Sequence, residues 1–243
     1  LEAVIEAVRA RKDAAFDEKA DARKRRWMDR KVAERAAVDA KFDSVRDRLP
    51  MPASRAMEVV AANLPEDCVV FDESVTGIQT FLHYWQPDRF DSYFMARGGC
   101  LGEGLPGGVG LKLACPDRPV AALSGDGAAM YTPQALWTAA HYKLDVTFFI
   151  FNNRSYRILK TNLVEYWKRQ NEDFRPFPFM DINDPPLDFV KLAESMGVAA
   201  VRVDNPADLE RATRESYARK GQGPRLIEIM VDGTVNPNEE TFV

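Results

Sequence analysis

From residue 53 onward, short apolar runs alternate with segments of helical pattern, and this alternation restricts the folds open to the chain. The apolar runs are CVVFD (68–72), SYFM (92–95), PVAALS (119–124), VTFFIF (146–151), AAVRV (199–203) and RLIEIMV (225–231). Most lack a polar residue at every second position, which is typical of strands covered on both faces. Strands that alternate with helices form parallel sheets with helices on both faces. The sequence therefore predicts an α/β fold with a doubly wound, mainly parallel, six-stranded sheet.

Helix-capping signals support this reading. Thr132 and Pro133 have the residue types of an N-cap and a first helical position, which predicts a helix over 132–142. Asn205 and Pro206 repeat the same pair before a later helical segment. Both segments lie between predicted strands, as the alternation requires.

The first fifty residues differ in composition from the rest. They carry 14 Lys/Arg and 11 Asp/Glu, a net charge of +3 that leaves −7 for the remainder. Charges of both signs alternate finely and apolar residues recur at helical spacing, which favours a solvated helix over a basic arm for nucleic acid. Pro50 and Pro52 then end the helix. We expect a charged helical linker over 1–52 and one domain over 53–243.

Composition excludes several classes of protein. The net charge of −4 argues against nucleic acid as a partner, and no run of 18 apolar residues predicts a membrane span. The three cysteines, Cys68, Cys100 and Cys115, form no C-x-x-C pair, and an odd number is poorly suited to a disulfide framework. We expect reduced thiols and a cytoplasmic location. The chain begins at Leu1 instead of methionine, which suggests a piece of a longer protein.

Two polar side chains follow neighbouring predicted strands. Asp126 follows the strand 119–124, and Asn153 follows the strand 146–151. If one helix joins these strands, both side chains emerge at the carboxyl edge of the sheet, where ligands of such folds bind. A carboxylate and an amide oxygen suit Mg²⁺, which usually completes its octahedron with phosphate oxygens and water. The pair therefore predicts a magnesium site.

The glycines around Asp126 suggest what the metal would hold. Gly125 and Gly127 allow a phosphate to approach the backbone, and the N–H groups of Ala128 and Ala129 are free to face it. Taken singly, the Gly-Asp-Gly and Asn-Asn motifs are ordinary turn sequences. Together, with 24 residues for one helix and one strand between them, they favour a metal-bound diphosphate.

The pattern GDG, two dozen residues and NN resembles the signature of thiamine diphosphate (ThDP) enzymes. Residues 53–231 are similar to the C-terminal, diphosphate-binding domain of the 2-oxoacid decarboxylase and acetolactate synthase group. The stretch GDGAAMYTPQALWTAAHYKLDVTFFIFNN resembles benzoylformate decarboxylase most closely. The resemblance implies a ThDP-binding fold that holds ThDP and Mg²⁺.

Site residues follow from this resemblance position by position. Asp126 and Asn153 would ligate the metal through their side chains, and Ser155 through its carbonyl. The remaining matches concern the cofactor: Leu101 would force it into a bent shape, the Gly99 carbonyl would bind its aminopyrimidine, Val75 and Thr76 would contact the diphosphate, and Tyr156 would pack over the phosphates.

The resemblance also implies an incomplete enzyme. ThDP enzymes of this group decarboxylate or carboligate small 2-oxoacids, and a glutamate of a separate pyrimidine-binding domain activates the cofactor. We expect that domain from the same full-length chain or from its mate in a homodimer or homotetramer. Glu73 and Glu103 are the nearest acidic residues, but they match the diphosphate and hinge segments. We therefore expect the 243-residue chain alone to be inactive.

Several alternatives remain. An acetolactate synthase-like carboligase is one, although SVTGIQ (74–79) stands where those enzymes usually carry G-Q-H-Q. A non-catalytic ThDP-binding or assembly domain is another. GEGLPG (102–107) matches the dinucleotide fingerprint G-x-G-x-x-G, which would suggest an NAD-dependent oxidoreductase, but Pro106 lies inside it.

Two histidines and one helix permit further functional readings. His83 and His141 could shuttle protons, but both occur in helical segments away from glycine-rich loops, which favours packing or exposed positions. The segment YRILKTNLVEYWKRQ (156–170) mixes aromatic and basic residues, as single-stranded nucleic-acid binders do. Its position after the predicted metal loop favours a helix that covers the cofactor.

Overall fold

The structure is a computed structural model that describes residues 1–87 and 89–237. The chain divides into two units, Leu1–Val45 and the remainder. The first unit contains two helices, α1 (Glu2–Arg11) and α2 (Ala14–Val45), where we expected one. They separate at Asp13, whose carboxylate accepts a hydrogen bond of 2.7 Å from the N–H of Phe16. In the described part of the chain, no helix combines the length and apolarity needed to cross a membrane.

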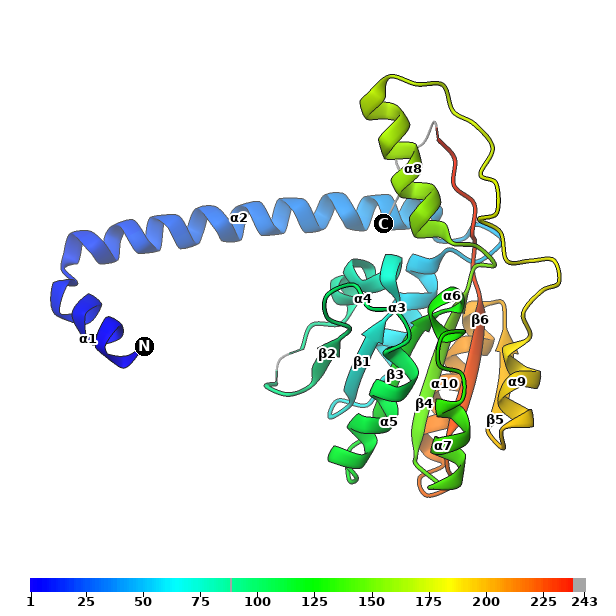
Figure 1. Cartoon of the computed structure of the whole chain (residues 1–243). Coiled ribbons are helices and arrows are strands. Elements are labelled where there is room, and N and C mark those ends of the chain that lie inside the picture. The colour runs from blue at the N-terminus through cyan, green and yellow to red at the C-terminus, as the bar shows by residue number, and fades with distance from the viewer. Residues whose placement is uncertain (88, 238–243) are drawn as a thin grey trace. The chain divides into compact units, whose positions relative to one another are not determined.

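The second unit contains the predicted sheet (Figure 1). Its strands are β1 (Val69–Glu73), β2 (Tyr93–Met95), β3 (Val120–Gly125), β4 (Val146–Asn152), β5 (Ala199–Val203) and β6 (Arg225–Met230). They lie in the order β2-β1-β3-β4-β6-β5, and every neighbouring pair is parallel. The doubly wound fold is confirmed, and each predicted strand end lies within one residue of the observed one.

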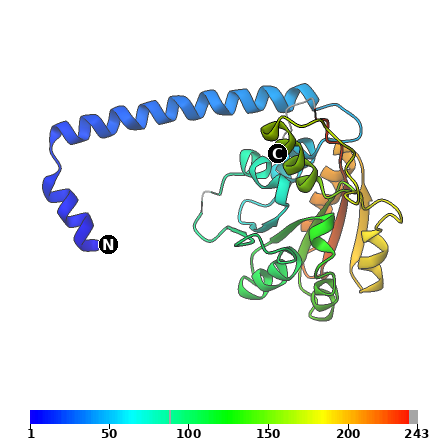
Figure 2. The same ribbon diagram turned by 45° about the horizontal axis from the view of Figure 1, so that its top comes forward.

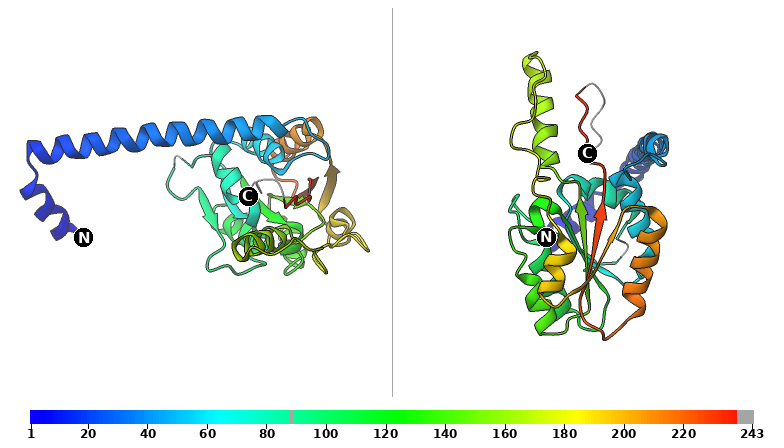
Figure 3. Two further views of the ribbon diagram at one scale, coloured as in Figure 1. Left: turned by 90° about the horizontal axis from the view of Figure 1, so that it is seen from above. Right: turned by 90° about the vertical axis from the view of Figure 1, so that its right-hand side faces the viewer.

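Helices cover both faces of the sheet, as the right-hand view of Figure 3 shows. Along β4, Phe149 and Phe151 point to one core cluster while Phe148 and Ile150 point to the other, so the strand is apolar on both sides. The first cluster is covered by α3 (Ala53–Asn63), α4 (Ile78–Tyr84) and α10 (Pro206–Ala218). The second is covered by α5 (Gly104–Ala114), α7 (Ala135–His141) and α9 (Phe189–Ser195).

The remaining short elements and one longer helix lie at the carboxyl ends of the strands. They are η1 (Val75–Gly77), α6 (Asp126–Ala129) and α8 (Arg157–Gln170). Helix α8 extends away from this edge of the sheet (Figures 1 and 2). The chain crosses from β1 to β2 on one side and to β3 on the other, so β1 and β3 flank a point where the strand order reverses. Ligands of open α/β sheets bind at such points.

One of the two predicted helix starts is wrong. Helix α7 begins at Ala135, not at Thr132, because the Thr132 hydroxyl donates a hydrogen bond of 2.6 Å to the carbonyl of Gly102 instead of capping the helix. The other start is confirmed: Asn205 accepts a hydrogen bond of 2.9 Å from the N–H of Asp208, and Pro206 opens α10.

Helix α5 packs very closely on the sheet. A Cβ atom added at Gly108 would lie 2.5 Å from the Cβ of Ala122 on β3, whereas one at Gly110 would meet no atom within 4 Å. The two glycines are on the same helix but face the core and the solvent, respectively. Close contact between α5 and β3 therefore requires a glycine at position 108 but not at position 110.

We expect Gly108→Ala to lower the free energy of unfolding by about 1–3 kcal/mol, because the new methyl group overpacks the contact with Ala122. The matched variant Gly110→Ala should raise it by up to about 1 kcal/mol, because alanine favours the helix at an exposed position. Urea unfolding of both variants measures the difference. A Gly108→Ala variant as stable as Gly110→Ala would contradict the close packing.

Candidate functional site

A cavity of about 360 Å³ lies at the carboxyl ends of four strands. Its walls are formed by the segments that follow those strands, together with parts of α3 and of the loop before α5. The segments are 74–77 after β1, 125–128 after β3, 153 and 155–159 after β4, and 231–232 after β6. The doubly wound topology therefore brings residues separated by more than 150 positions to one site.

Asp126 is the first residue of α6 and only 3% exposed. One carboxylate oxygen accepts a hydrogen bond of 2.8 Å from the N–H of Gly127, and the other accepts one of 2.7 Å from the N–H of Arg154. Burial raises the pKa of Asp126 to about 6, although these backbone donors oppose the shift. The site thus holds a carboxylate whose charge is only partly compensated by the protein.

Asn153 follows β4 and shares the cavity wall with Asp126. Its side-chain oxygen accepts a hydrogen bond of 2.9 Å from the N–H of Ser155, which closes a tight turn around Arg154 with φ of 54°. The Ser155 hydroxyl donates to the carbonyl of Met180 over 3.1 Å, and the N–H of Tyr156 donates to the same carbonyl over 2.9 Å. A distant segment of chain therefore fixes the conformation of this loop.

The glycines beside Asp126 have different surroundings. A Cβ atom at Gly127 would lie 3.0 Å from the ring of Tyr156, so this ring packs directly on the Gly127 backbone. A Cβ atom at Gly125 would meet no atom within 4 Å. Gly127 thus allows Tyr156 to approach, whereas Gly125 borders open space in the cavity.

Val75 has a strained backbone at the cavity wall. Its φ is 55°, a region that β-branched residues rarely adopt and that costs on the order of 1–3 kcal/mol. The turn is held from below by Asp72, which is buried and accepts a hydrogen bond of 2.8 Å from the N–H of Ser74. Val75 and Thr76 both line the cavity. Strain at this place is typical of backbone shaped for a ligand.

Leu101 lines the cavity with a side chain that is 46% exposed. The loop that carries it is anchored by Glu73, which is only 2% exposed at the end of β1. Glu73 accepts hydrogen bonds of 2.7, 2.9 and 2.8 Å from the N–H groups of Gly102, Glu103 and Gly104. Neither Glu73 nor Glu103 belongs to the cavity lining, and Glu73 instead fixes the start of α5.

The residues predicted for the site all line this cavity, with the exception of Gly99 and Ala129. Gly99 is exposed with φ of 74°, and Ala129 is the fully buried last residue of α6. Both histidines lie outside the lining as well: His83 contacts the ring of Tyr84, and His141 stacks on Trp137 at 4.9 Å.

Sequence reasoning missed two charged residues of the lining, Arg157 and Asp232. Burial lowers the pKa of the Arg157 guanidinium, and the nearby negative charge of Asp232 opposes that shift. Among the described residues that line the cavity, Arg157 is the only lysine or arginine. Its place as the first residue of the helix after the Asn-Asn motif was the available signal.

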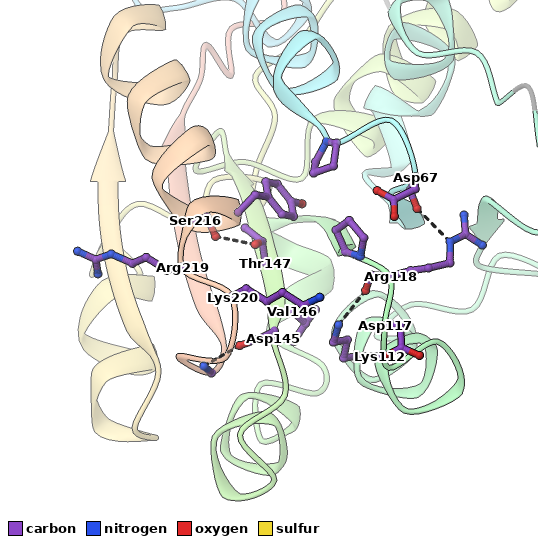
Figure 4. A pocket seen from close by; sticks show the side chains of 14 residues that line it. Asp67, Lys112, Asp117, Arg118, Asp145, Val146, Thr147, Ser216, Arg219 and Lys220 are labelled. Atoms are coloured by element: carbon purple, nitrogen blue, oxygen red, sulfur yellow. Dashed lines mark hydrogen bonds between the residues drawn. The ribbon is translucent and has the colours of Figure 1, made fainter.

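A second cavity, of about 300 Å³, lies at the opposite edge of the sheet, near the starts of β3 and β4 (Figure 4). Its polar side chains bond mainly to neighbouring parts of the protein. Lys112 donates to the carbonyls of Pro116 and Arg118 over 2.9 and 2.8 Å, and Asp145 accepts from the N–H of Gly223 over 2.7 Å. These bonds join the ends of helices and strands, so this cavity has a structural explanation.

The fold and the first cavity define a class of protein: parallel α/β domains with a buried carboxylate in a ligand cavity across the ends of the central strands. Residues 60–229 match the family model described as thiamine pyrophosphate enzyme, C-terminal TPP binding domain. The chain therefore belongs to this family of ThDP (thiamine pyrophosphate) enzymes.

Known proteins with similar sequences include relatives of acetolactate synthase and benzoylformate decarboxylase. The chain is 38% identical over 193 residues to IlvX of Mycobacterium tuberculosis, a candidate acetolactate synthase large subunit. It is 32% identical over 188 residues to benzoylformate decarboxylase of Pseudomonas aeruginosa. These matches cover 78% and 77% of this chain but only 37% and 34% of the relatives.

Among solved structures, the ThDP-dependent 4-hydroxybenzoylformate decarboxylase of Rhodococcus jostii is similar, with a TM-score of 0.67 and 34% identity. The match covers 76% of this chain and 33% of that protein. The chain thus spans about a third of the length of the relatives it matches.

The dinucleotide fingerprint has a structural explanation. Of its glycines, Gly104 and Gly107 pack α5 on the sheet, since an added Cβ would lie 2.7 Å from Glu73 and 2.5 Å from Phe71. Gly102 has φ of 96°, which favours glycine. None of the three lines the cavity that contains Asp126. The G-x-G-x-x-G match therefore lends no support to an NAD site.

The raised pKa of Asp126 predicts a pH-dependent stability of the metal-free protein. The pKa of Asp126 is about 6 in the folded protein, whereas the ordinary pKa of an aspartate is 3.8. Ionised Asp126 therefore destabilises the fold above pH 6 and has no such effect below pH 4. As pH rises from 4 to 7, we expect wild type to lose about 3 kcal/mol of unfolding free energy relative to Asp126→Asn, at roughly 1.4 kcal/mol per unit.

Urea unfolding of both proteins in the presence of a chelator, at several pH values between 4 and 7, measures this difference. Other titrating groups cancel in the comparison because the two proteins share them. A stability difference that stays constant over this range would show that Asp126 titrates normally.

Proposed function

We propose that this chain supplies the ThDP- and Mg²⁺-binding half of the active site in an enzyme that decarboxylates or carboligates 2-oxoacids. Membership of the ThDP enzymes supports the cofactor, and the similarity to acetolactate synthase and benzoylformate decarboxylases supports the reaction class. The single observation that carries the proposal is the cavity in which Asp126 and Asn153 meet at the ends of β3 and β4.

The residues present fit a Mg²⁺ ion. Asp126 offers a buried charged oxygen, and Asn153 offers an amide oxygen that retains a free lone pair beside its bond to Ser155. With the Ser155 carbonyl, the set consists of hard oxygen ligands and leaves positions for phosphate oxygens and water, as Mg²⁺ prefers. A bound cation would also favour the ionised form of Asp126, whose burial in the metal-free protein opposes it.

The cavity also fits a diphosphate. Gly125 and Gly127 expose backbone along the wall beside Asp126, and Tyr156 lies against Gly127. A diphosphate carries more negative charge than one Mg²⁺ balances once Asp126 is counted. Arg157, the one basic residue of the described lining, supplies the compensating charge in this proposal. We infer that its guanidinium contacts the diphosphate, with Asp232 orienting it.

The remaining predicted contacts concern the rings of the cofactor. Leu101 projects into the cavity from a loop that Glu73 holds rigidly, as an apolar support for a bent cofactor requires. Val75 and Thr76 present backbone and hydroxyl groups at the strained turn after β1. When bound, the cofactor supplies the carbanion-stabilising chemistry of the reaction, and the protein contributes position and electrostatics.

The choice between decarboxylation and carboligation depends on substrate contacts outside this chain. Apolar residues of the lining, among them Leu101, Tyr131 and Leu159, suit the apolar part of a small 2-oxoacid under either reaction. Relatives of both kinds support the broader statement equally. A domain that binds ThDP only for assembly is the non-catalytic alternative.

A second domain completes the proposed site. Since the chain spans about a third of its relatives, we propose that a pyrimidine-binding domain, from the same protein or from the mate in a homodimer or homotetramer, covers the exposed side of the cavity and supplies the activating glutamate. Among described residues, the carboxylates of the lining are those of Asp126 and Asp232, which serve the metal and Arg157 in this proposal.

The proposed function predicts Mg²⁺-dependent ThDP binding by the intact protein. Asp126→Asn should abolish this binding, because the metal loses its only charged protein ligand. Calorimetric titration with ThDP, with and without Mg²⁺, measures the effect. Asp232→Asn, the same change elsewhere in the cavity wall, is the matched control and should retain the dependence on Mg²⁺. Equal ThDP affinity of wild type and Asp126→Asn would refute the metal site.

The 243-residue chain alone should show no turnover, because no described residue of its cavity is placed to activate the cofactor. The assay measures CO₂ release from a panel of 2-oxoacids in the presence of ThDP and Mg²⁺. Sustained turnover that Glu73→Gln or Glu103→Gln abolishes would show that the chain carries its own activating acid, contrary to this proposal.

A further inference from the structure

A buried carboxylate lies outside the cavity, on the mainly apolar face of the sheet that α9 covers. Glu228 of β6 is 0% exposed, and its neighbours along this face include Ile150 and Leu226. One carboxylate oxygen accepts a hydrogen bond of 2.6 Å from the side-chain amide of Asn152, and the other accepts one of 2.8 Å from the guanidinium of Arg202. A charge at such a position is costly unless it is paired and hydrogen-bonded.

The hydrogen bonds continue from Asn152 into the cavity wall. Asn152 is 1% exposed, and its side-chain oxygen accepts a hydrogen bond of 3.1 Å from the N–H of Arg154. That same N–H donates to Asp126 over 2.7 Å. An unbroken series of polar contacts therefore runs from Arg202 on β5, through Glu228 on β6 and Asn152 on β4, to the carboxylate of Asp126 after β3.

The side chains of the two asparagines in the Asn-Asn motif thus point in opposite directions. Asn152 is the last residue of β4 and turns into the protein, toward Glu228. Asn153 leaves the strand and lines the cavity. Successive side chains of a strand point to opposite faces. At the end of β4, one polar side chain therefore faces the core and the next faces the cavity.

The series fixes the turn that carries Asn153 and Ser155. Arg154 has φ of 54°, which is unusual for a residue with a side chain, and its N–H is shared between Asn152 and Asp126. Without Glu228, the side-chain amide of Asn152 would lose its acceptor in a site without access to water, and reorientation of that amide would release Arg154. Strand β6 therefore constrains the geometry of the loop through the side chain of Asn152.

We propose that Glu228 and Arg202 are positioning residues for the metal site, acting through Asn152 on the loop 153–155. This inference rests on the proposed function, because it concerns how that site is held in shape. Neither residue is part of the cavity lining. Partners of this kind orient metal ligands, and their loss typically lowers metal affinity about 10–100-fold.

The test compares Mg²⁺-dependent ThDP binding in variants of the intact protein. Glu228→Gln keeps the size of the side chain but leaves one acceptor oxygen for two donors, the Arg202 guanidinium and the Asn152 amide. Because the charged guanidinium forms the stronger hydrogen bond, the new NH₂ group then faces the Asn152 amide, and we expect the Mg²⁺ concentration for half-maximal ThDP binding to rise at least about tenfold. Arg202→Gln should raise it less, because the side chain is 41% exposed and Asn152 keeps its acceptor. The Arg202 variant also provides a measurement if Glu228→Gln fails to fold.

A rescue variant separates positioning from general damage to the core. In the double variant Asn152→Asp/Glu228→Gln, the carboxylate and the amide exchange places. The amide of residue 228 can then donate to residue 152, while its oxygen still accepts from Arg202 and the new carboxylate still accepts from Arg154. We expect the Mg²⁺ requirement to return to within about threefold of the wild-type value, because every donor of the series again has an acceptor.

The matched control is Glu58→Gln. Glu58 is ion-paired with Arg46 over 2.6 Å and partly buried, but it does not contact the loop 153–155. Its Mg²⁺ requirement should equal that of wild type. The thermal unfolding midpoint of each protein without metal shows how much of any change is ordinary loss of stability.

The proposal is overturned if Glu228→Gln lowers the unfolding midpoint but leaves the Mg²⁺ requirement unchanged, or if the double variant binds no better than Glu228→Gln. Failure of the underlying function looks different: wild type would then bind no ThDP in Mg²⁺ at all. A defect confined to the variants therefore tests the positioning role alone.

Discussion

The buried carboxylate of Asp126 is the constraint on which the rest of the site depends. It stands at the end of β3 with 3% exposure, and the N–H groups of Gly127 and Arg154 bond to it. Those donors require the tight turn at Gly125–Gly127 and the left-handed conformation of Arg154. The parallel register of β3 and β4 then places both turns at one edge of the sheet. Burial disfavours the charge of Asp126, yet the carboxylate lies where four strands end together. Such a position has a physical explanation if the carboxylate binds a cation.

Charged side chains at the two ends of the strands have different partners. At the starts of the strands, Lys112 and Asp145 bond to nearby backbone, so the charges stabilise turns and helix ends. At the carboxyl edge, the cavity contains two carboxylates and one guanidinium, and the backbone of Val75 is strained. Unbalanced charge and strain persist in a fold only where the surrounding structure fixes them. Here the apolar core on both faces of β3 and β4 provides that rigidity.

Sequence reasoning recovered the parts of this structure that depend on local pattern. The six strands follow from unbroken apolar runs, and the meeting of Asp126 with Asn153 follows from parallel topology. The start of α7 was wrong because Thr132 has a partner, Gly102, that is distant in sequence. The anchoring roles of Glu73 and Glu228 were missed for the same reason: only the folded sheet shows which groups these strand carboxylates bind. Long-range hydrogen bonds leave no periodic signal.

This distinction explains why a motif can be recognised while its support remains hidden. The cavity-lining residues Asp126 and Asn153, which we propose as metal ligands, lie beside glycine and asparagine, whose residue types are constrained by the turn itself. The residues that hold those loops lie in strands, where any side chain with the right reach could serve. Glu73 fixes the loop of Leu101 from β1, and Glu228 fixes that of Asn153 from β6. Both carboxylates are buried, but Glu73 binds its loop directly from the end of β1, whereas Glu228 lies within β6 and acts through Asn152. The cavity is therefore shaped from both flanks of the β3–β4 pair by acids that never reach its surface.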